Sequence, residues 1–416
     1  MTNRRIRKYN STRILTYIWR NQGATVEALT ADIGIPRPTV YRLISELVKS
    51  GHIMAAAKRE STLGRKAVLY SLNPCYRYVL GVNLDKLYVK TFIADLTGKV
   101  IVNWSHALKA EQTKEEMLGI MEVGIDALIG TRGAPNEYAA KIGIISVGAT
   151  ASIASNGETI HVFNSRECLN GFNIVQYFQE RYGVKTILAK SSTLRTLAYL
   201  RELGDIGIND YVYIYIGTGI GAGIVIDGKY YRGFFGAAGE FARAPLGGEA
   251  GRTLEGSYSL TRLHAQIQEY LGRTGDQQLL QKLALLDGMD IELNQRMMRM
   301  ADQCLQYGDE EIRGIVEKAC GEWGRLCGMI AAFYDPRILV IGGEVNSWTP
   351  NIYDRIRANF VQVNDAKIEM MPARPILSWD ELIAVNALEP LMDLLSTEPA
   401  DTPEKEAGDG ICEMEA

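Results

Sequence analysis

The sequence predicts an α/β protein in which a small, mainly helical N-terminal domain precedes a larger body of strands and helices. Three observations lead to this fold class. The chain is 416 residues long, its positive charge is concentrated near the N-terminus, and strand-like apolar runs lead into glycine-rich turns further along. A chain of this length exceeds one ordinary hydrophobic core, so two or three domains are expected.

The charge is divided unevenly along the chain. Residues 1–70 contain 13 Lys and Arg against 4 Asp and Glu, a net charge of +9, whereas the remaining residues carry −13. A basic segment joined to an acidic body is typical of proteins that bind nucleic acid, because neutralised phosphates supply most of the non-specific affinity. Charge alone indicates no sequence preference.

The N-terminal segment has the periodicity of three short helices. The first ends near Asn21, the second is capped by Thr25 and stopped by Gly34, and the third is opened by Pro36 and ended by Gly51. Two helices joined by a short turn are a helix-turn-helix. Residues 53–57 and 67–72 then read as two strands around the basic segment 58–66, which predicts a wing.

In such a domain the start of the third helix enters the major groove, where arginine bonds bidentately to guanine and threonine contacts bases or phosphates. We therefore expect double-stranded DNA to be contacted by Arg37, Thr39, Tyr41 and Arg42 of the third helix and by Arg65 and Lys66 of the wing. The alternative is a small helical domain that docks another protein through its charged faces.

Several function classes are excluded by what the sequence lacks. It has no run of about 18 apolar residues and no export signal, so we expect a cytoplasmic protein that does not enter a membrane. The six cysteines form no CxxC pair and the four histidines form no HExxH motif. We therefore expect free thiols, no metal and no cofactor.

From about Arg13 to Leu395 the chain resembles the ROK family of repressors, open reading frames and kinases, and within it the xylose-repressor-like and N-acetylglucosamine-repressor-like regulators. The resemblance rests on residues 28–40, on the wing 61–66, and on a later glycine loop followed by Ala238-Gly239-Glu240 and by the strand 338–344. The loop resembles the second phosphate loop of sugar kinases through Gly217, Thr218, Gly219 and Gly221. The resemblance implies a two-lobed, actin-like (ribonuclease H-like) sugar-kinase fold behind the winged helix-turn-helix.

The same resemblance implies that the kinase chemistry has been lost. Family kinases carry an Asn-Asp pair after a strand that here spans 185–189, and this chain has Lys190 and Ser191 instead, so the catalytic aspartate has become a serine. The first phosphate loop aligns with 83–87 and lacks its aspartate and glycines, and the family's zinc-binding cysteines are missing. We expect no enzyme activity; the alternative is an active sugar kinase that uses ATP.

Residues that would line the sugar site imply an effector. The resemblance assigns this role to Glu240, Glu255 and Asn170, and adds two basic residues, Lys190 and Arg243. The two cations favour a sugar that carries an acid or phosphate group. The alternative is a degenerate cleft in which these cations form structural ion pairs with Glu240 or Glu255. In the family fold two lobes close around a ligand, which would change the spacing of two DNA-binding domains in a homodimer or a dimer of dimers.

The expected domains are 1–74 for DNA binding, 75–189 for the first lobe with a final helix within 376–395, 190–375 for the second lobe, and an acidic disordered tail over 396–416. Within the lobes the patterns predict a strand and hairpin over 78–102, a helix over 113–129, a strand over 141–147, a helix that ends at Tyr182, long helices over 258–334 and a helix over 379–395.

Overall fold

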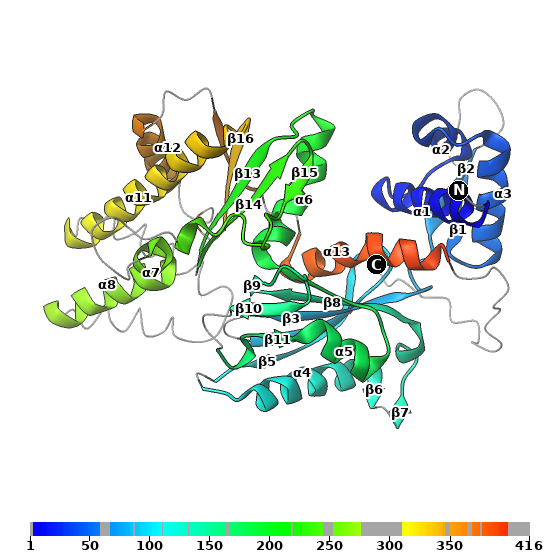
Figure 1. Ribbon diagram of the computed structural model, residues 1–416, viewed down its shortest axis with the longest axis horizontal. Coiled ribbons are helices and arrows are strands. Elements are labelled where there is room, and N and C mark those ends of the chain that lie inside the picture. The colour runs from blue at the N-terminus through cyan, green and yellow to red at the C-terminus, as the bar shows by residue number, and fades with distance from the viewer. Residues whose placement is uncertain are drawn as a thin grey trace. The chain divides into compact units, whose positions relative to one another are not determined.

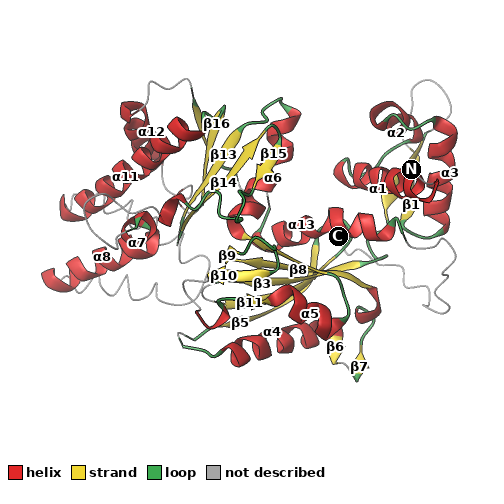
Figure 2. Cartoon of the chain, viewed as in Figure 1, coloured by secondary structure: helices red, strands yellow, loops and turns green. Residues whose placement is uncertain are grey.

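The computed structural model describes residues 3–58, 67–85, 88–109, 111–131, 133–162, 167–217, 219–243, 253–275, 310–343, 345, 350–363, 368–374 and 377–397. The chain divides into two compact units. Unit 1 comprises 1–150, 158–189 and 378–416, and unit 2 comprises 151–157 and 190–377. Figure 1 labels the elements, and Figure 2 separates helices from strands.

The N-terminal part of unit 1 has three helices and a two-stranded sheet. Its elements are α1 (Asn3–Arg20), α2 (Val26–Ile33), α3 (Arg37–Lys49), β1 (Ile53–Lys58) and β2 (Val68–Leu72). The strands pair antiparallel, with Ile53 opposite Leu72. The three helices and the two wing strands expected from the sequence are confirmed. The centre of the wing, with Arg65 and Lys66, lies outside the described residues.

The rest of unit 1 is built on a five-stranded sheet with the order β12-β8-β3-β4-β5. The strands are β3 (Tyr78–Leu84), β4 (Tyr88–Ala94), β5 (Val100–Ala107), β8 (Ile142–Ala149) and β12 (Thr186–Lys190). Strands β3, β4 and β5 form an antiparallel meander, and β8 runs parallel to β3. The expected strand and hairpin over 78–102 is therefore this meander, which continues to Ala107.

Helices cover both faces of this sheet. Helix α4 (Lys114–Ile129) packs on β4 and β5, and α13 (Trp379–Leu395) packs on β3 and β8 (Figure 1). Both begin with capping boxes, from Thr113 and from Ser378, so their first amides have side-chain acceptors. Unit 1 also holds α5 (Ile174–Tyr182), the one-turn helices η1 (Ala139–Lys141) and η2 (Glu167–Leu169), and the short strands β6 (Gly130–Thr131), β7 (Ala134–Pro135), β10 (Thr159–Val162) and β11 (Phe172–Asn173).

Unit 2 contains a second five-stranded sheet, with the order β15-β14-β13-β16-β17. Its strands are β13 (Tyr211–Ile216), β14 (Ile220–Ile226), β15 (Lys229–Tyr231), β16 (Ile338–Gly342) and β17 (Glu369–Pro372). The first three again form an antiparallel meander, and β16 runs parallel to β13. The two sheets therefore share one strand order, although their sequences show no internal repeat.

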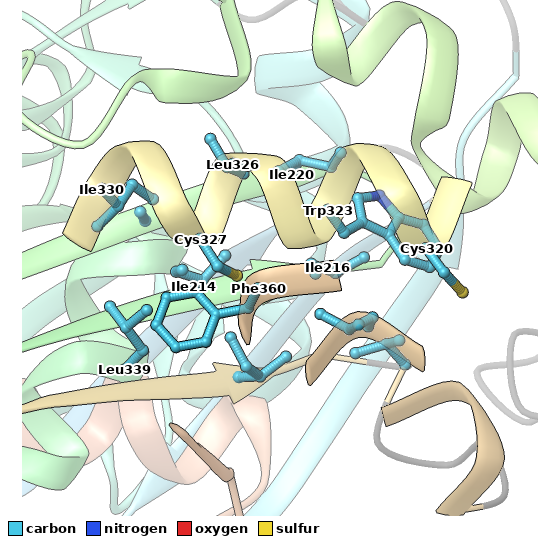
Figure 3. Close-up of a cluster of buried hydrophobic side chains, with 14 of the residues drawn as sticks. Ile214, Ile216, Ile220, Cys320, Trp323, Leu326, Cys327, Ile330, Leu339 and Phe360 are labelled. Carbon is cyan, nitrogen blue, oxygen red and sulfur yellow. The ribbon is translucent and has the colours of Figure 1, made fainter. Parts of the chain in front are cut away.

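The alternation of β13 explains how unit 2 buries both faces of its sheet. Successive strand residues point to opposite faces. Tyr211 and Tyr213 pack with Tyr199 of α6 (Ser191–Asp205), whereas Ile214 and Ile216 pack on the other face. There they meet Trp323 and Cys327 of α11 (Glu310–Tyr334) and Phe360 of α12 (Pro350–Val363), as Figure 3 shows.

The remaining elements of unit 2 are β9 (Ser152–Ile153), η3 (Phe241–Arg243), α7 (Leu254–Tyr258) and α8 (Leu260–Thr274). The expected long helices over 258–334 correspond to α8 and α11, and residues 276–309 lie outside the described residues. The final helix over 379–395 is confirmed as α13. All but the first two residues of the acidic tail lie outside the described part.

Candidate functional site

The helix-turn-helix is built by local signals around one turn. Thr25 caps α2 by accepting the amide of Ala28 at 3.2 Å, and Gly34 ends the helix with a φ of +63°, a conformation that glycine adopts without strain. Proline at the start of α3 costs no hydrogen bond, because the first amides of a helix have no partner within it. The buried stripe of α3 is Val40, Leu43, Ile44 and Leu47.

The opposite face of α3 carries the predicted DNA contacts. Arg37, Tyr41 and Arg42 are exposed, and the side chains of the two arginines are 56% and 60% accessible. Thr39 is half-buried. The structure places these four residues on one short helical segment, which leaves the guanidinium groups able to meet another molecule.

Both arginines form ion pairs with acidic residues that the sequence analysis did not predict. Arg37 contacts Glu27 of α2 at 2.8 Å and donates to the Tyr41 hydroxyl at 3.3 Å. Arg42 lies 3.6 Å from Glu46, one helical turn away. The Arg42–Glu46 spacing of four residues is visible in the sequence. The Arg37–Glu27 pair forms only when α2 and α3 pack.

The second group of predicted site residues meets in unit 2. Lys190 ends β12 and is the N-cap residue of α6, and its side chain is only 8% accessible. Its ammonium group donates to the Ala238 carbonyl at 3.2 Å and to Oε1 of Glu240 at 3.1 Å. Nε of Arg243 lies 3.5 Å from Oε2 of the same carboxylate. Glu240 therefore lies between two cations.

A glycine makes this approach possible. Gly239 has a φ of +84°, and a Cβ there would lie 2.3 Å from the Ala222 carbonyl oxygen of β14. Only glycine lets the chain pass the strand this closely. The next residue, Glu240, is thereby brought to Lys190, which comes from a segment 50 residues earlier.

Two other predicted effector contacts are placed differently. Glu255 lies in α7, which packs on the η3 turn that carries Arg243. Asn170 follows η2 and is exposed, and it belongs to unit 1, whereas the Lys190 cluster belongs to unit 2.

The glycine-rich loop has a packing role that its sequence did not reveal. The Gly217 amide donates to the Gly219 carbonyl at 2.9 Å, and the Gly217 carbonyl accepts the Leu260 amide of α8 at 2.9 Å. A Cβ on Gly221 would lie 3.5 Å from Ser192, and a Cβ on Gly223 would lie 2.0 Å from the Thr196 hydroxyl. Gly223 therefore lets α6 pack directly on β14, whereas a Cβ on Gly221 would make an ordinary van der Waals contact. Thr218 lies outside the described residues.

A polar cluster forms around Asn83 in unit 1, within the segment 83–87 that the resemblance aligns with the first phosphate loop. Asn83 of β3 accepts from the Trp379 indole at 2.7 Å and donates to Asp380 at 3.0 Å. Asp380 also forms an ion pair with Lys90 of β4. Sequence reasoning identified Asn83 only as part of a lost loop, because its partners lie almost 300 residues away.

Cys320 and Cys327 of α11 are buried free cysteines. Burial raises the pKa of Cys320 and of Cys327 to about 12, which keeps both thiols protonated near neutral pH. Among the residues that the structure places, no group of three or more His, Cys, Asp or Glu side chains could hold a metal ion. None of the helices it describes is long and apolar enough to cross a membrane.

Comparison with known proteins identifies both parts of the chain. Residues 79–377 match the ROK family model, and residues 7–54 match a winged helix-turn-helix DNA-binding model. The chain is 24% identical over 242 residues to the xylose repressor of Caldicellulosiruptor bescii, covering 58% of this chain and 59% of that protein. It is 21% identical over 314 residues to the transcriptional dual regulator NagC of Escherichia coli, covering 74% and 73%.

Solved structures agree in fold. A ROK family transcriptional regulator, described as a homologue of the E. coli MLC protein, superposes with a TM-score of 0.71 at 17% identity, covering 94% of this chain and 98% of that one. A ROK family glucokinase from Streptomyces griseus superposes with a TM-score of 0.56 at 17% identity, covering 74% and 98%. The protein thus has an N-terminal winged helix-turn-helix and a ROK sugar-kinase-like body, and the chain belongs to the ROK family.

Proposed function

We propose that this chain is a sequence-specific DNA-binding transcriptional regulator, a repressor of carbohydrate-related genes whose kinase-like body binds an effector. The observation that carries the proposal is the exposed face of α3, with Arg37 and Arg42, on a domain that matches a winged helix-turn-helix model. Relatives named as repressors support it, although the chain spans only about three-fifths of the length of the xylose repressors it matches.

On binding, DNA would replace Glu27 as the partner of Arg37. The exposed Arg37–Glu27 pair contributes little to stability, because water screens the two charges. A bidentate arginine–guanine contact is worth about 1–3 kcal/mol of base discrimination. We expect a base edge to replace Glu27 as the partner of Arg37, and until then Glu27 and Tyr41 keep the guanidinium over the start of α3.

The test is selection of DNA from a randomised pool by the purified full-length chain, followed by titration of Arg37→Ala and Arg42→Ala. Each variant should lose on the order of tenfold or more in affinity for the selected site and should relax its base preference. Arg325→Ala is the matched control, since Arg325 is an exposed, ion-paired arginine of unit 2. Equal losses in all three variants, or no selected sequence, would contradict the proposal.

The kinase-like body is proposed to be catalytically inactive. Ser191 stands where family kinases have the catalytic aspartate, and a serine cannot serve as the base. Asn83 is engaged by Trp379 and Asp380, and the Gly217 amide is engaged by Gly219. The alternative, an active sugar kinase, predicts sugar-dependent ATP turnover that exceeds a no-sugar control across a panel of hexoses and amino sugars.

The effector is proposed to be a sugar that carries an acid or phosphate group, bound in unit 2 near Lys190, Glu240 and Arg243 with a further contact from Glu255. The two cations beside Glu240 can supply charge-assisted hydrogen bonds, which favours an anionic ligand. Calorimetry with neutral sugars, sugar acids and sugar phosphates tests this proposal. Arg243→Gln should weaken only the anionic ligands, whereas failure of every ligand to bind would leave the ion pairs as purely structural.

We also propose that the chain assembles as a homodimer or a dimer of dimers in the cytoplasm. Helix-turn-helix domains bind two half-sites about one helical turn of DNA apart, which requires two copies of α3. Light scattering of the purified chain, with and without the selected DNA, measures the assembly, and a monomer bound to a single half-site would contradict it.

A further inference from the structure

Helix α13, the last helix that the structure describes, contacts the first helix, α1. Lys8 of α1 pairs with Asp393 of α13 at 2.8 Å, and the Thr12 hydroxyl donates to Oγ of Ser396 at 2.9 Å. Arg20, the final residue of α1, pairs with Glu389. Figure 1 shows the two helices side by side within unit 1. We call these three pairs the docking contacts.

The other part of α13 is fixed to the sheet of unit 1. Trp379 and Asp380 bond to Asn83 of β3, and Asp380 also pairs with Lys90 of β4. Further along, the buried Ser146 hydroxyl of β8 donates to the Ile383 carbonyl at 2.7 Å. These bonds hold α13 to the strands β3, β4 and β8. The helix therefore has a fixed position on the sheet of unit 1, and α1 docks on it.

A second attachment joins the N-terminal domain to the same sheet. Asn73 follows β2. Its side-chain amide donates to the Gly51 carbonyl at 2.9 Å, and its backbone amide donates to the His52 carbonyl at 3.0 Å. The His52 ring lies 4.3 Å from the Tyr76 ring, and Tyr76 precedes β3 by two residues. The N-terminal domain is therefore held at both ends, by α13 and by this short connection.

The docking contacts leave the DNA-binding face free. Arg37, Tyr41 and Arg42 stay exposed while α1 is docked. The docked arrangement is thus one that can engage DNA, and it fixes the direction in which α3 is presented.

We propose that the docking contacts position the DNA-binding domain, so that in a dimer the two α3 helices accept only one half-site spacing. The residues are Lys8, Thr12 and Arg20 on α1, with Glu389, Asp393 and Ser396 on α13. This inference rests on the proposed DNA-binding function. A tethered but undocked domain would tolerate many spacings, because a flexible attachment lets each copy find its half-site independently.

The first experiment measures docking without DNA. The double variant Thr12→Cys/Ser396→Cys places two thiols where the hydroxyl oxygens lie 2.9 Å apart, and oxidation should form an intramolecular disulfide. Each single variant is the control for pairing with the native cysteines. Cross-linking in the double variant alone supports docking, and its absence overturns the inference whatever the DNA results are.

The second experiment measures spacing. The probe is the DNA selected by the unaltered chain, compared with the same DNA carrying 5 extra base pairs, about half a turn, between the half-sites. Glu389→Lys/Asp393→Lys should lower affinity for the selected spacing on the order of tenfold, because two pairs become repulsive. The ratio between the two spacings should fall toward one, and affinity for an isolated half-site should not change.

Two further variants separate docking from charge. Glu317→Lys/Glu322→Lys makes the same charge change at exposed ion pairs of α11 and should leave the spacing ratio unaltered. The oxidised Thr12→Cys/Ser396→Cys protein should keep the full ratio. An unchanged ratio in Glu389→Lys/Asp393→Lys would overturn the positioning role. Failure of the unaltered chain to select any DNA would overturn the proposed function and this role with it, while the disulfide would still report docking.

Discussion

Removal of Glu240 should destabilise unit 2 more than removal of its lysine partner does. The Lys190 side chain is 8% accessible, and its ammonium group pairs with the Glu240 carboxylate at 3.1 Å. Glu240→Ala would leave a buried ammonium group with the Ala238 carbonyl as its acceptor. Lys190→Met would remove the buried charge and keep the Arg243–Glu240 contact.

The magnitudes follow from burial. Loss of one partner of a buried pair costs about 3–5 kcal/mol. Glu240 is 30% accessible and the Ala238 bond survives, so we expect about 2 kcal/mol for Glu240→Ala. Lys190→Met should cost about 1 kcal/mol or less, since it mainly leaves the Ala238 carbonyl unbonded. The double variant should cost little more than Lys190→Met alone.

Urea unfolding of the full-length chain, combined with hydrogen exchange of peptides that cover β13 and β14, measures these differences in the unit that holds the pair. Arg325→Ala, at an exposed pair of the same unit, sets the baseline near zero. The reasoning is refuted if Lys190→Met costs as much as Glu240→Ala, or if the double variant costs the sum of the two.

Three further predictions concern packing and reactivity. Gly223→Ala should cost about 1–3 kcal/mol, because the new Cβ meets the Thr196 hydroxyl, and Gly223→Ala/Thr196→Ala should recover part of that loss in the same unfolding assay. Asp380→Leu should cost about 3 kcal/mol by leaving Lys90 without its carboxylate, measured by unfolding of unit 1, with Glu381→Gln at the same helix start costing about 1 kcal/mol or less. Cys320 and Cys327, with pKa values raised to about 12, should resist alkylation at pH 8 in the folded chain and react in urea; equal rates in both states would contradict their burial.

The local elements could be predicted because their signals are local. Thr25, Gly34 and the proline at the start of α3 fix the helix-turn-helix within a dozen residues. The final helix carries its own capping box at Ser378 and Glu381. Neither depends on what the rest of the chain does, so a reading of the sequence suffices.

The glycines of 217–223 show what a motif leaves open. Their spacing predicts a phosphate loop, and in the structure Gly223 also makes room for Thr196 of α6. A glycine needed for close packing and a glycine needed for a phosphate look identical in sequence. Only the neighbouring helix distinguishes them.

The polar partners of the site residues could not be predicted, since they come from distant segments. Asn83 meets Asp380, 297 positions away, and Lys8 meets Asp393, 385 positions away. The sequence supplied the residue types of the Lys190 cluster and left open whether they bind a ligand or each other. In the structure Glu240 pairs with both Lys190 and Arg243, and the binding of an effector stays a prediction.

The most direct test of the central claim is a DNA-binding titration of the full-length chain at physiological salt, with the selected site and with a shuffled sequence of the same composition. The account predicts affinity for the selected site at least a thousandfold above that for the shuffled one, and loss of that difference in Arg37→Ala/Arg42→Ala. Equal, salt-sensitive affinity for both sequences would contradict the claim that this chain reads DNA sequence.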